Sequence, residues 1–255
     1  MQCEWKLDGH NCVFYTLPYM FEGYQYSEPI LFKTTYPIEN KQWLSKTVYS
    51  FNYFLSNSDC STLLNIHFLN ATILSIKLPI NEQFWSMIPS VAQVKNLSVS
   101  FTDDNDDDNN RNQLQKILSQ ITCLSIFYIR EHPSRVFNIL SFDNKDLSVF
   151  FLDLISTDFV YDNDQCAKLS ELSFVTNCKA LAIVVENRTC VTNLINALNN
   201  LQALTVVCQD DTWSEESMSD DDDDELLQWF QQQLPSIYII LRRSDRPRNI
   251  AFWIH

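Results

Sequence analysis

Glycine is nearly absent from this chain of 255 residues, which contains only Gly9 and Gly23. At the average usage of about 7%, a chain of this length would carry roughly 18 glycines. Phosphate-binding loops, dinucleotide fingerprints and nucleophile elbows need glycine where the backbone takes a positive φ or closely approaches a ligand. No glycine follows residue 23. The scarcity therefore argues against nucleotide-dependent enzymes and α/β-hydrolases.

Positive charge is also scarce. The chain has 18 Lys and Arg against 32 Asp and Glu, which gives a formal net charge of −14 and a sequence pI of about 4.5. This balance disfavours nucleic acid and anionic membranes as partners and favours basic ones, although an acidic surface also simply keeps a protein soluble. The opening residues show no signal-peptide pattern, and no run reaches the roughly 20 apolar residues of a membrane span. We expect a cytoplasmic or nuclear protein that is not secreted.

Residue types that carry catalysis or bind metals are present but scattered. The eight cysteines form no CxxC pair, and the four histidines fit neither an HExxH nor a zinc-finger pattern. Neither aspartate-rich run has the glycine and glutamate spacing of an EF-hand loop. Cysteine–histidine catalysis between residues distant in sequence stays open at this point. We expect no catalytic residue, no metal and no cofactor, and we interpret the cysteines as reduced, mostly buried thiols.

A short phrase recurs along the chain, in which leucine is followed by a small residue and then by isoleucine or valine. Its leucines are Leu74, Leu97, Leu124, Leu147, Leu181 and Leu204. All but one of the intervals between successive leucines fall within the period of leucine-rich repeats, which is about 20–29 residues. The exception is the longer interval from Leu147 to Leu181. Each phrase lies in a run with the alternating polarity of a β-strand.

Helix-like stretches separate the phrases. Apolar residues at helical spacing predict helices that contain Leu114, Ile117, Leu118 and Ile121, then Val191, Leu194, Ile195 and Leu198, then Leu227, Phe230 and Leu234. As their N-caps we expect Asn109 or Asn110, Thr189 and Asp224. The alternation predicts an α/β fold, namely a leucine-rich-repeat-like solenoid with parallel strands on its concave side, helices on its convex side and irregular ends. A doubly wound α/β fold is the alternative, and the short, near-constant period favours the solenoid.

The sequence divides into four parts. Residues 1–45 form an aromatic-rich segment that we expect to abut the repeats, and residues 46–209 hold the irregular repeats. Residues 210–224 form an acidic loop. Residues 225–255 contain a terminal repeat and a capping element, in which residues 249–255 are expected to form the last edge strand.

Two acidic runs interrupt the pattern, each after a predicted strand and before a predicted helix. They contain Asp103, Asp104, Asp106, Asp107 and Asp108 in the first, and Asp220, Asp221, Asp222, Asp223 and Asp224 in the second. Dense like charges stay solvated, and a helix dipole favours negative charge at its N-terminus. A solvated loop is the simpler interpretation, and a landing site for a basic partner segment is the functional one. The arginines at positions 242, 243, 246 and 248 either pair with the nearby acidic loop, protect a terminal sheet edge or bind an acidic partner.

Strand geometry predicts where a partner would bind. If the Leu and Ile/Val positions point into the core, the alternate positions face the concave side of the solenoid. These positions are Lys77, Ser100, Phe127, Phe150, Val184 and Val207, with Arg242 in a looser seventh copy. The two phenylalanines and two valines would form a contiguous apolar strip, which usually marks a partner site, although a neighbouring insertion could cover it.

Several segments resemble the C-terminal half of F-box-like proteins with irregular leucine-rich repeats. They are NLINALNNLQALTV at residues 193–206, WFQQQLPSIYIILRR at residues 229–243 and the closing NIAFWIH. The aromatic segment HNCVFYTLPYMFEGY at residues 10–24 resembles the link that precedes such repeats. In that family an N-terminal F-box binds an adaptor of a cullin ubiquitin ligase, and the repeats recruit a target. No LPxE-type F-box helix opens this chain, and the family supplies no catalytic residues.

These observations predict a non-enzymatic protein–protein interaction module. Its partner is a protein target, and the resemblance implies target recognition for a cullin-type ubiquitin ligase, with a ligase adaptor as a further partner. The alternative is an acidic, chaperone-like binder of basic proteins that acts through the aspartate-rich loops. Neither nucleic acid nor a membrane is expected as a partner.

Overall fold

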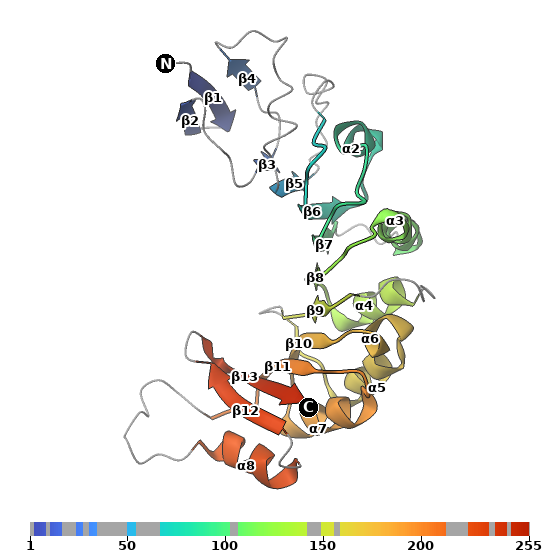
Figure 1. The fold of residues 1–255 in the computed structure, drawn as a ribbon, viewed down its shortest axis with the longest axis vertical. Coiled ribbons are helices and arrows are strands. Elements are labelled where there is room, and N and C mark those ends of the chain that lie inside the picture. The colour runs from blue at the N-terminus through green and yellow to red at the C-terminus, as the bar shows by residue number, and fades with distance from the viewer. Residues whose placement is uncertain are drawn as a thin grey trace. The chain divides into compact units, whose positions relative to one another are not determined.

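A computed structural model shows an α/β protein, as the alternation of apolar patterns predicted (Figure 1). It describes residues 3–8, 11–16, 24–27, 31–34, 50–54, 67–102, 107–141, 149–155, 159–212, 224–234, 238–243 and 246–254. The chain divides into two compact units, an N-terminal unit Met1–Leu124 and a C-terminal unit Ser125–His255, and each is described by itself. No helix within the described ranges is long and apolar enough to cross a bilayer.

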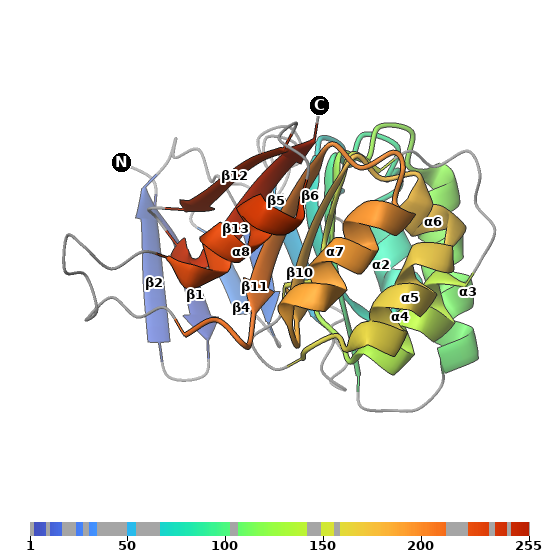
Figure 2. The ribbon, with the colours of Figure 1, turned by 90° about the horizontal axis from the view of Figure 1, so that it is seen from below.

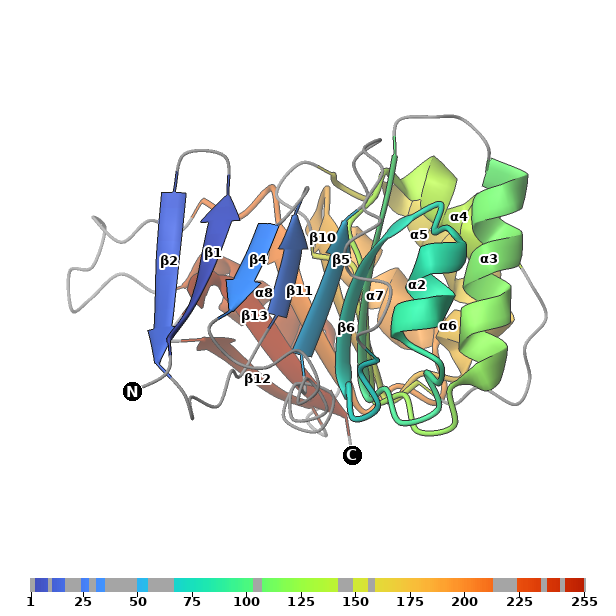
Figure 3. The same ribbon diagram turned by 90° about the horizontal axis from the view of Figure 1, so that it is seen from above.

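The N-terminal unit contains an antiparallel group of strands and a parallel group. The antiparallel group has the order β2-β1-β4, formed by β1 (Cys3–Asp8), β2 (Asn11–Thr16) and β4 (Leu31–Thr34). The parallel group has the order β7-β6-β5-β3, formed by β3 (Tyr24–Ser27), β5 (Ser50–Phe54), β6 (Ile73–Leu78) and β7 (Asn96–Phe101). Helices α2 (Glu82–Met87) and α3 (Asp107–Gln120) lie together on one side of β5 and β6 (Figure 3).

Register links the repeated phrase to the sheet in the N-terminal unit. Phe51, Leu74 and Leu97 are neighbours across β5, β6 and β7, and they are equally spaced in the sequence. Every second side chain along β6 and β7 is buried, and the others are half-buried or, at Ile73, exposed, so one face of these strands forms the core. The predicted stripe of α3 is buried as well. The predicted caps Asn109 and Asn110 are wrong, because α3 begins at Asp107 and both residues lie inside it.

The C-terminal unit has a six-stranded sheet with the order β12-β13-β11-β10-β9-β8. The strands are β8 (Ile126–Ile129), β9 (Phe151–Asp153), β10 (Ala180–Val185), β11 (Ala203–Cys208), β12 (Tyr238–Arg243) and β13 (Arg246–Ile254). The helices are α4 (Pro133–Leu140), α5 (Asn163–Glu171), α6 (Ser173–Thr176), α7 (Arg188–Ala197) and α8 (Glu225–Gln233). Strands β8 to β11 are parallel, and α4 to α7 lie together on one side of β10 and β11 (Figure 2).

The third phrase does not occupy the strand position that the sequence predicted. Register aligns Phe127, Leu152, Leu181 and Leu204 across β8 to β11. Leu124 precedes this position by three residues, and Leu147 lies outside the described residues. A three-residue phrase recurs by chance in an apolar chain, whereas burial against the helices fixes the phase of a strand.

The C-terminal edge also differs from the prediction. Residues 249–255 were expected to form the last edge strand, but β13 lies between β11 and β12 and is antiparallel to both. The cap predicted at Thr189 is wrong, because the side chain of Asn187 accepts hydrogen bonds from the Thr189 and Cys190 N–H groups at 3.1 and 3.3 Å. The cap predicted at Asp224 is confirmed by its 3.0 Å hydrogen bond from the Leu227 N–H.

Candidate protein-binding face

The sheet of the C-terminal unit has one face packed under helices. Residues paired in register point to the same face, and Leu152, Leu181, Leu204, Phe252 and Ile240 form one such row across five strands. All of these side chains are buried. The Phe252 ring meets that of Phe230 in α8 edge-on, with centroids 5.0 Å apart. We call this side the helix face.

The opposite side, which we call the open face, is built from the alternate residues. One row joins Phe151, Ala180, Ala203, Trp253 and Ile239, and the next row joins Asp153, Ala182, Thr205, Ala251 and Leu241. The alanines of β10 and β13 are buried, and each has at least one larger neighbour on an adjacent strand. Exposure rises toward β12 and β13, so the open face ends in an apolar hairpin.

That hairpin carries a cluster of exposed apolar side chains. Ile239, Leu241 and Trp253 are 47%, 54% and 42% exposed, and we call them the hairpin patch. Ile239 and Trp253 are direct cross-strand partners, and Leu241 follows one row away. Burial of a large apolar side chain contributes about 1.5–3 kcal/mol. An apolar cluster left exposed at a sheet edge is therefore a typical protein-interaction surface.

The residues predicted to bind a partner are only partly brought together. Lys77 and Ser100 are cross-strand partners in the N-terminal unit and lie, half-buried, on the face opposite the core, as their position in the pattern predicted. Val184 and Val207 are cross-strand partners on the open face of the C-terminal unit, where Val184 is buried and Val207 half-buried. The role of these four residues in binding stays a prediction.

The contiguous apolar strip is wrong as predicted. Phe127 belongs to the core, since its side chain is 0% exposed and its ring lies 5.5 Å from that of Phe174. The phase of β8 differs by one residue from the phase that the phrase around Leu124 implied. Phe150 is exposed but precedes β9, where its carbonyl accepts hydrogen bonds from the N–H groups of Lys179 and Ala180.

Arg242 is on the helix face rather than on the open face. It is the register partner of the buried Ile250, and its guanidinium is held between two carboxylates. Its Nε donates to Asp224 at 2.6 Å and its Nη1 donates to Asp211 at 2.7 Å. The side chains of Arg242 and Asp211 are only 9% and 7% exposed. The prediction that an arginine of this cluster pairs with the acidic loop is thereby confirmed for Arg242.

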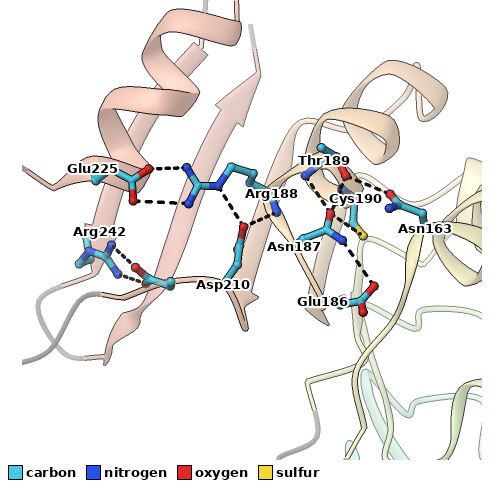
Figure 4. A network of polar contacts seen from close by, with 10 residues as sticks. Asn163, Glu186, Asn187, Arg188, Thr189, Cys190, Asp210, Glu225 and Arg242 are labelled. Carbon is cyan, nitrogen blue, oxygen red and sulfur yellow. Dashed lines mark hydrogen bonds and ion pairs between the residues drawn. The ribbon is translucent and has the colours of Figure 1, made fainter.

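A second arginine forms a parallel clamp (Figure 4). Arg188, at the first residue of α7, donates to Asp210 through Nε at 2.9 Å and to Glu225 through Nη1 at 2.7 Å. Asp210 and Asp211 follow β11, whereas Asp224 and Glu225 begin α8. The two arginines therefore hold both ends of the acidic insertion, Arg188 from α7 and Arg242 from β12.

The clamps also set the protonation of these carboxyls. Burial would raise the pKa of Asp224, but hydrogen bonds from the Arg242 guanidinium and the Leu227 N–H outweigh it and hold that pKa below its usual value. Hydrogen bonds from Arg188 lower the pKa of Glu225. Both carboxyls are therefore charged at neutral pH, and the helix dipole of α8 favours this charge.

Most of the predicted acidic surface lies outside the described residues, namely Asp103, Asp104, Asp106, Asp220, Asp221, Asp222 and Asp223. Asp107 and Asp108 form the first turn of α3, and Asp108 bonds Arg111 at 2.8 Å while its side chain remains 83% exposed. Asp224 is engaged with Arg242 and caps α8. Its carboxylate therefore stabilises the fold instead of extending an acidic landing site.

The buried thiols are poorly suited to catalysis. Cys166, Cys178, Cys190 and Cys208 are buried, and Cys123 is exposed. Burial raises the pKa of Cys178 to about 12, and it raises the pKa of the other three buried thiols as well. A nucleophilic thiol needs the opposite shift. Within the described parts of the chain, no group of three or more His, Cys, Asp or Glu could hold a metal ion.

The sequence interpretation missed the hairpin patch. In the segment YIILRR both alternating faces are apolar, and this signal indicates a strand with a second, non-core apolar face. The antiparallel pairing that brings Trp253 beside Ile239 leaves no trace in a search for parallel repeats.

No protein-family model matches the chain, and no curated protein is detectably similar to it.

Proposed function

We propose that this chain is a non-catalytic, leucine-rich-repeat-like module that binds a protein target through the open face of its C-terminal unit. Residues aligned on successive parallel strands, Phe127, Leu152, Leu181 and Leu204, are spaced within the leucine-rich-repeat period of about 20–29 residues, which supports the repeat assignment. The resemblance to F-box-like proteins supports target recruitment for a cullin-type ubiquitin ligase, together with an adaptor. A cytoplasmic or nuclear location is part of the proposal, since buried free thiols are typical of reducing compartments.

The observation that carries the proposal is the hairpin patch. Among the residues that the structure describes, six large apolar side chains are strongly exposed, namely Leu69, Ile73, Phe150, Ile239, Leu241 and Trp253. Three of the six lie on adjacent positions of one hairpin. Aromatic and aliphatic side chains clustered in this way are the usual energetic centre of a protein interface.

Affinity purification of the tagged chain from its native cell tests the proposal. The triple variant Ile239→Ser, Leu241→Ser, Trp253→Ala should lose a specific protein that the wild-type chain retains in high salt. Leu69→Ser is the matched control, because Leu69 is 49% exposed but lies in the N-terminal unit. Retention of every captured protein by the triple variant would remove the open face as the binding surface.

The same purification distinguishes binding through the open face from the alternative function. An acidic binder of basic proteins would lose its partners as salt rises, since exposed charges are screened over about 8 Å at physiological ionic strength. The exposed Asp108 supports this alternative, whereas the engagement of Asp224 with Arg242 weakens it. Partners that vanish in high salt and ignore the triple variant would favour the acidic runs. Recovery of a cullin adaptor would support the ligase assignment.

A further inference from the structure

The buried stripe of α3 contains one polar residue. Asn110 is 0% exposed and lies on the same side of the helix as Leu114, Ile117 and Leu118. Within the described ranges, neither Oδ1 nor Nδ2 of its amide has a hydrogen-bond partner. A buried amide left unpaired costs free energy, so such a group commonly marks a bound water molecule or ion. The amide of Asn110 is therefore a candidate ligand group.

The amide of Asn110 is directed toward the first turn of α3. Helix side chains point back toward the N-terminus, so that of Asn110 lies over the turn that begins at Asp107. Residues three apart also share one side of a helix. Asp107 is half-buried, whereas Asp108 is exposed. Asp107 thus lies on the buried side of α3, next to the amide of Asn110.

Thr102 contributes a further oxygen at the same end of α3. Its N–H donates to the Leu78 carbonyl at 2.9 Å, which places Thr102 beside the end of β6. Two residues after Leu78, both backbone groups of Ile80 bond the Gln113 side chain of α3, at 2.7 and 3.2 Å. Because Asn110 precedes Gln113 by about one turn, it lies near the same segment as Thr102. The Thr102 Oγ1 is buried and has no hydrogen-bond partner among the described residues.

We propose that the N-terminal end of α3 binds a hard divalent cation through Asn110 Oδ1, Thr102 Oγ1 and one carboxylate oxygen of Asp107. Ca²⁺ and Mg²⁺ take oxygen ligands and complete their coordination with water. Asp107 makes a further contact of its own, but a carboxylate has about four lone-pair positions, and the cation needs one of them. With Oδ1 on the cation, Nδ2 donates to a water molecule that the same ion holds.

Charge favours a cation over an anion at this site. A helix dipole attracts anions to the N-terminus, but Asp107 and Asp108 already occupy the first turn of α3. Three more aspartates precede them in the sequence, at positions 103, 104 and 106. These three lie outside the described residues and are not counted as ligands, but their charge raises the local concentration of cations. The proposal departs from the expectation that the chain binds no metal.

Thermal unfolding of the full chain, followed by circular dichroism, tests the proposal. The melts are recorded in EDTA, in CaCl₂, in MgCl₂ and in NaCl of matched ionic strength, since salt alone screens the acidic surface. With a single carboxylate, we expect a dissociation constant of about 0.1–1 mM. At roughly twenty times that concentration the midpoint should rise by about 5 °C relative to NaCl. A rise with either salt supports the proposal, and the larger rise identifies the preferred ion.

Two neighbouring aspartates provide a matched pair of variants. Asp107→Asn should weaken cation binding at least about fivefold, because the cation loses its charged ligand. Asp108→Asn removes the same charge from the same helical turn. It should keep the cation-dependent rise, because the Asp108 side chain is 83% exposed and bonds Arg111. Equal loss in the two variants would show that the rise depends on net charge and would overturn the assignment of ligands.

Replacement of Asn110 by leucine gives a result of opposite sign with and without the cation. In EDTA the variant should unfold at a midpoint equal to or above that of the wild-type chain, because leucine removes an unpaired buried amide. In CaCl₂ or MgCl₂ only the wild-type midpoint should rise. The EDTA measurement also shows that the variant folds.

Equal wild-type midpoints in CaCl₂, MgCl₂ and matched NaCl would overturn the proposal. So would a rise that persists in Asn110→Leu, because the cation would then bind the acidic runs alone. A variant already less stable than the wild-type chain in EDTA would show that protein or water satisfies the amide. The inference goes beyond the proposed function, because the site is in the N-terminal unit and needs no target. Loss of target capture by the hairpin-patch variant is a separate result, so failure of one proposal leaves the other standing.

Discussion

Replacement of Arg242 by leucine should strongly destabilise the C-terminal unit. Leucine keeps part of the apolar stem but removes the guanidinium that neutralises Asp211 and Asp224. Their side chains are 7% and 19% exposed, so both charges would remain poorly solvated. Breaking a buried ion pair by removal of one partner costs about 3–5 kcal/mol. At roughly 3 °C per kcal/mol for a unit of this size, the midpoint of thermal unfolding should fall by about 10 °C.

The loss of stability caused by Arg242→Leu should depend on pH in one direction. In the wild-type chain the folded-state pKa of Asp224 is depressed, so its contribution to stability is present above the unfolded pKa of about 3.9 and is lost as pH falls through the lower folded value. Without Arg242, the guanidinium no longer lowers the pKa of Asp224, whereas burial still opposes its ionisation. The folded-state pKa of Asp224 is therefore higher in the variant, and the variant loses less stability than the wild-type chain as the pH falls. The difference in stability between the two proteins should be full at pH 7 and should shrink as the pH falls below about 4.

Urea unfolding followed by circular dichroism at pH 7 and at about pH 3 measures this difference. Arg188→Leu is the matched control, and it should cost much less because Glu225, one of its two partners, is 65% exposed. A loss below about 1 kcal/mol for Arg242→Leu at pH 7, or a loss that does not shrink below about pH 4, would refute a buried, charged clamp.

Three further predictions follow from the packing. Phe127→Ala should lower the free energy of unfolding by about 3–5 kcal/mol, and Phe150→Ala should lower it by less than about 1 kcal/mol. If urea titrations gave the reverse order, Phe127 would not be a core residue. Asn187→Ala should cost about 1 kcal/mol through the lost cap of α7, measured in the same way, and a neutral result would contradict that cap. A thiol reagent with peptide mapping should label the exposed Cys123 first. Early labelling of a buried thiol would contradict the burial of that residue. The buried thiols are Cys166, Cys178, Cys190 and Cys208.

Local patterns predicted much of the fold. The apolar stripes of α3 and α7 are buried as their helical spacing indicated. The reason is that the apolar residues of an amphipathic helix form one stripe, and this stripe packs against the core. The phrases at Leu74, Leu97, Leu181 and Leu204 also lie in strands at the predicted phase. The phase failed at Phe127, since a one-residue change exchanges the two faces of a strand and only contact with Phe174 decides between them.

The candidate site was less predictable than the fold. Four of the positions proposed from strand alternation lie on the expected side of their strands, namely Lys77, Ser100, Val184 and Val207. Arg242 lies on the other side, because antiparallel pairing with β13 sets the phase of β12 independently of the parallel repeats. The hairpin patch was missed for the same reason.

The sequence by itself determined the α/β class, the near absence of glycine-dependent motifs, the helical stripes and the excess of negative charge, since these depend on composition and on spacings of a few residues. Only the tertiary structure decided which strand forms the edge, which apolar residues stay exposed and which carboxylates the two arginines bind. These features join residues such as Asp211 and Arg242, which are distant in sequence and meet only when β13 pairs with both β11 and β12. Pairing of this kind depends on the free energy of the whole unit rather than on any local pattern.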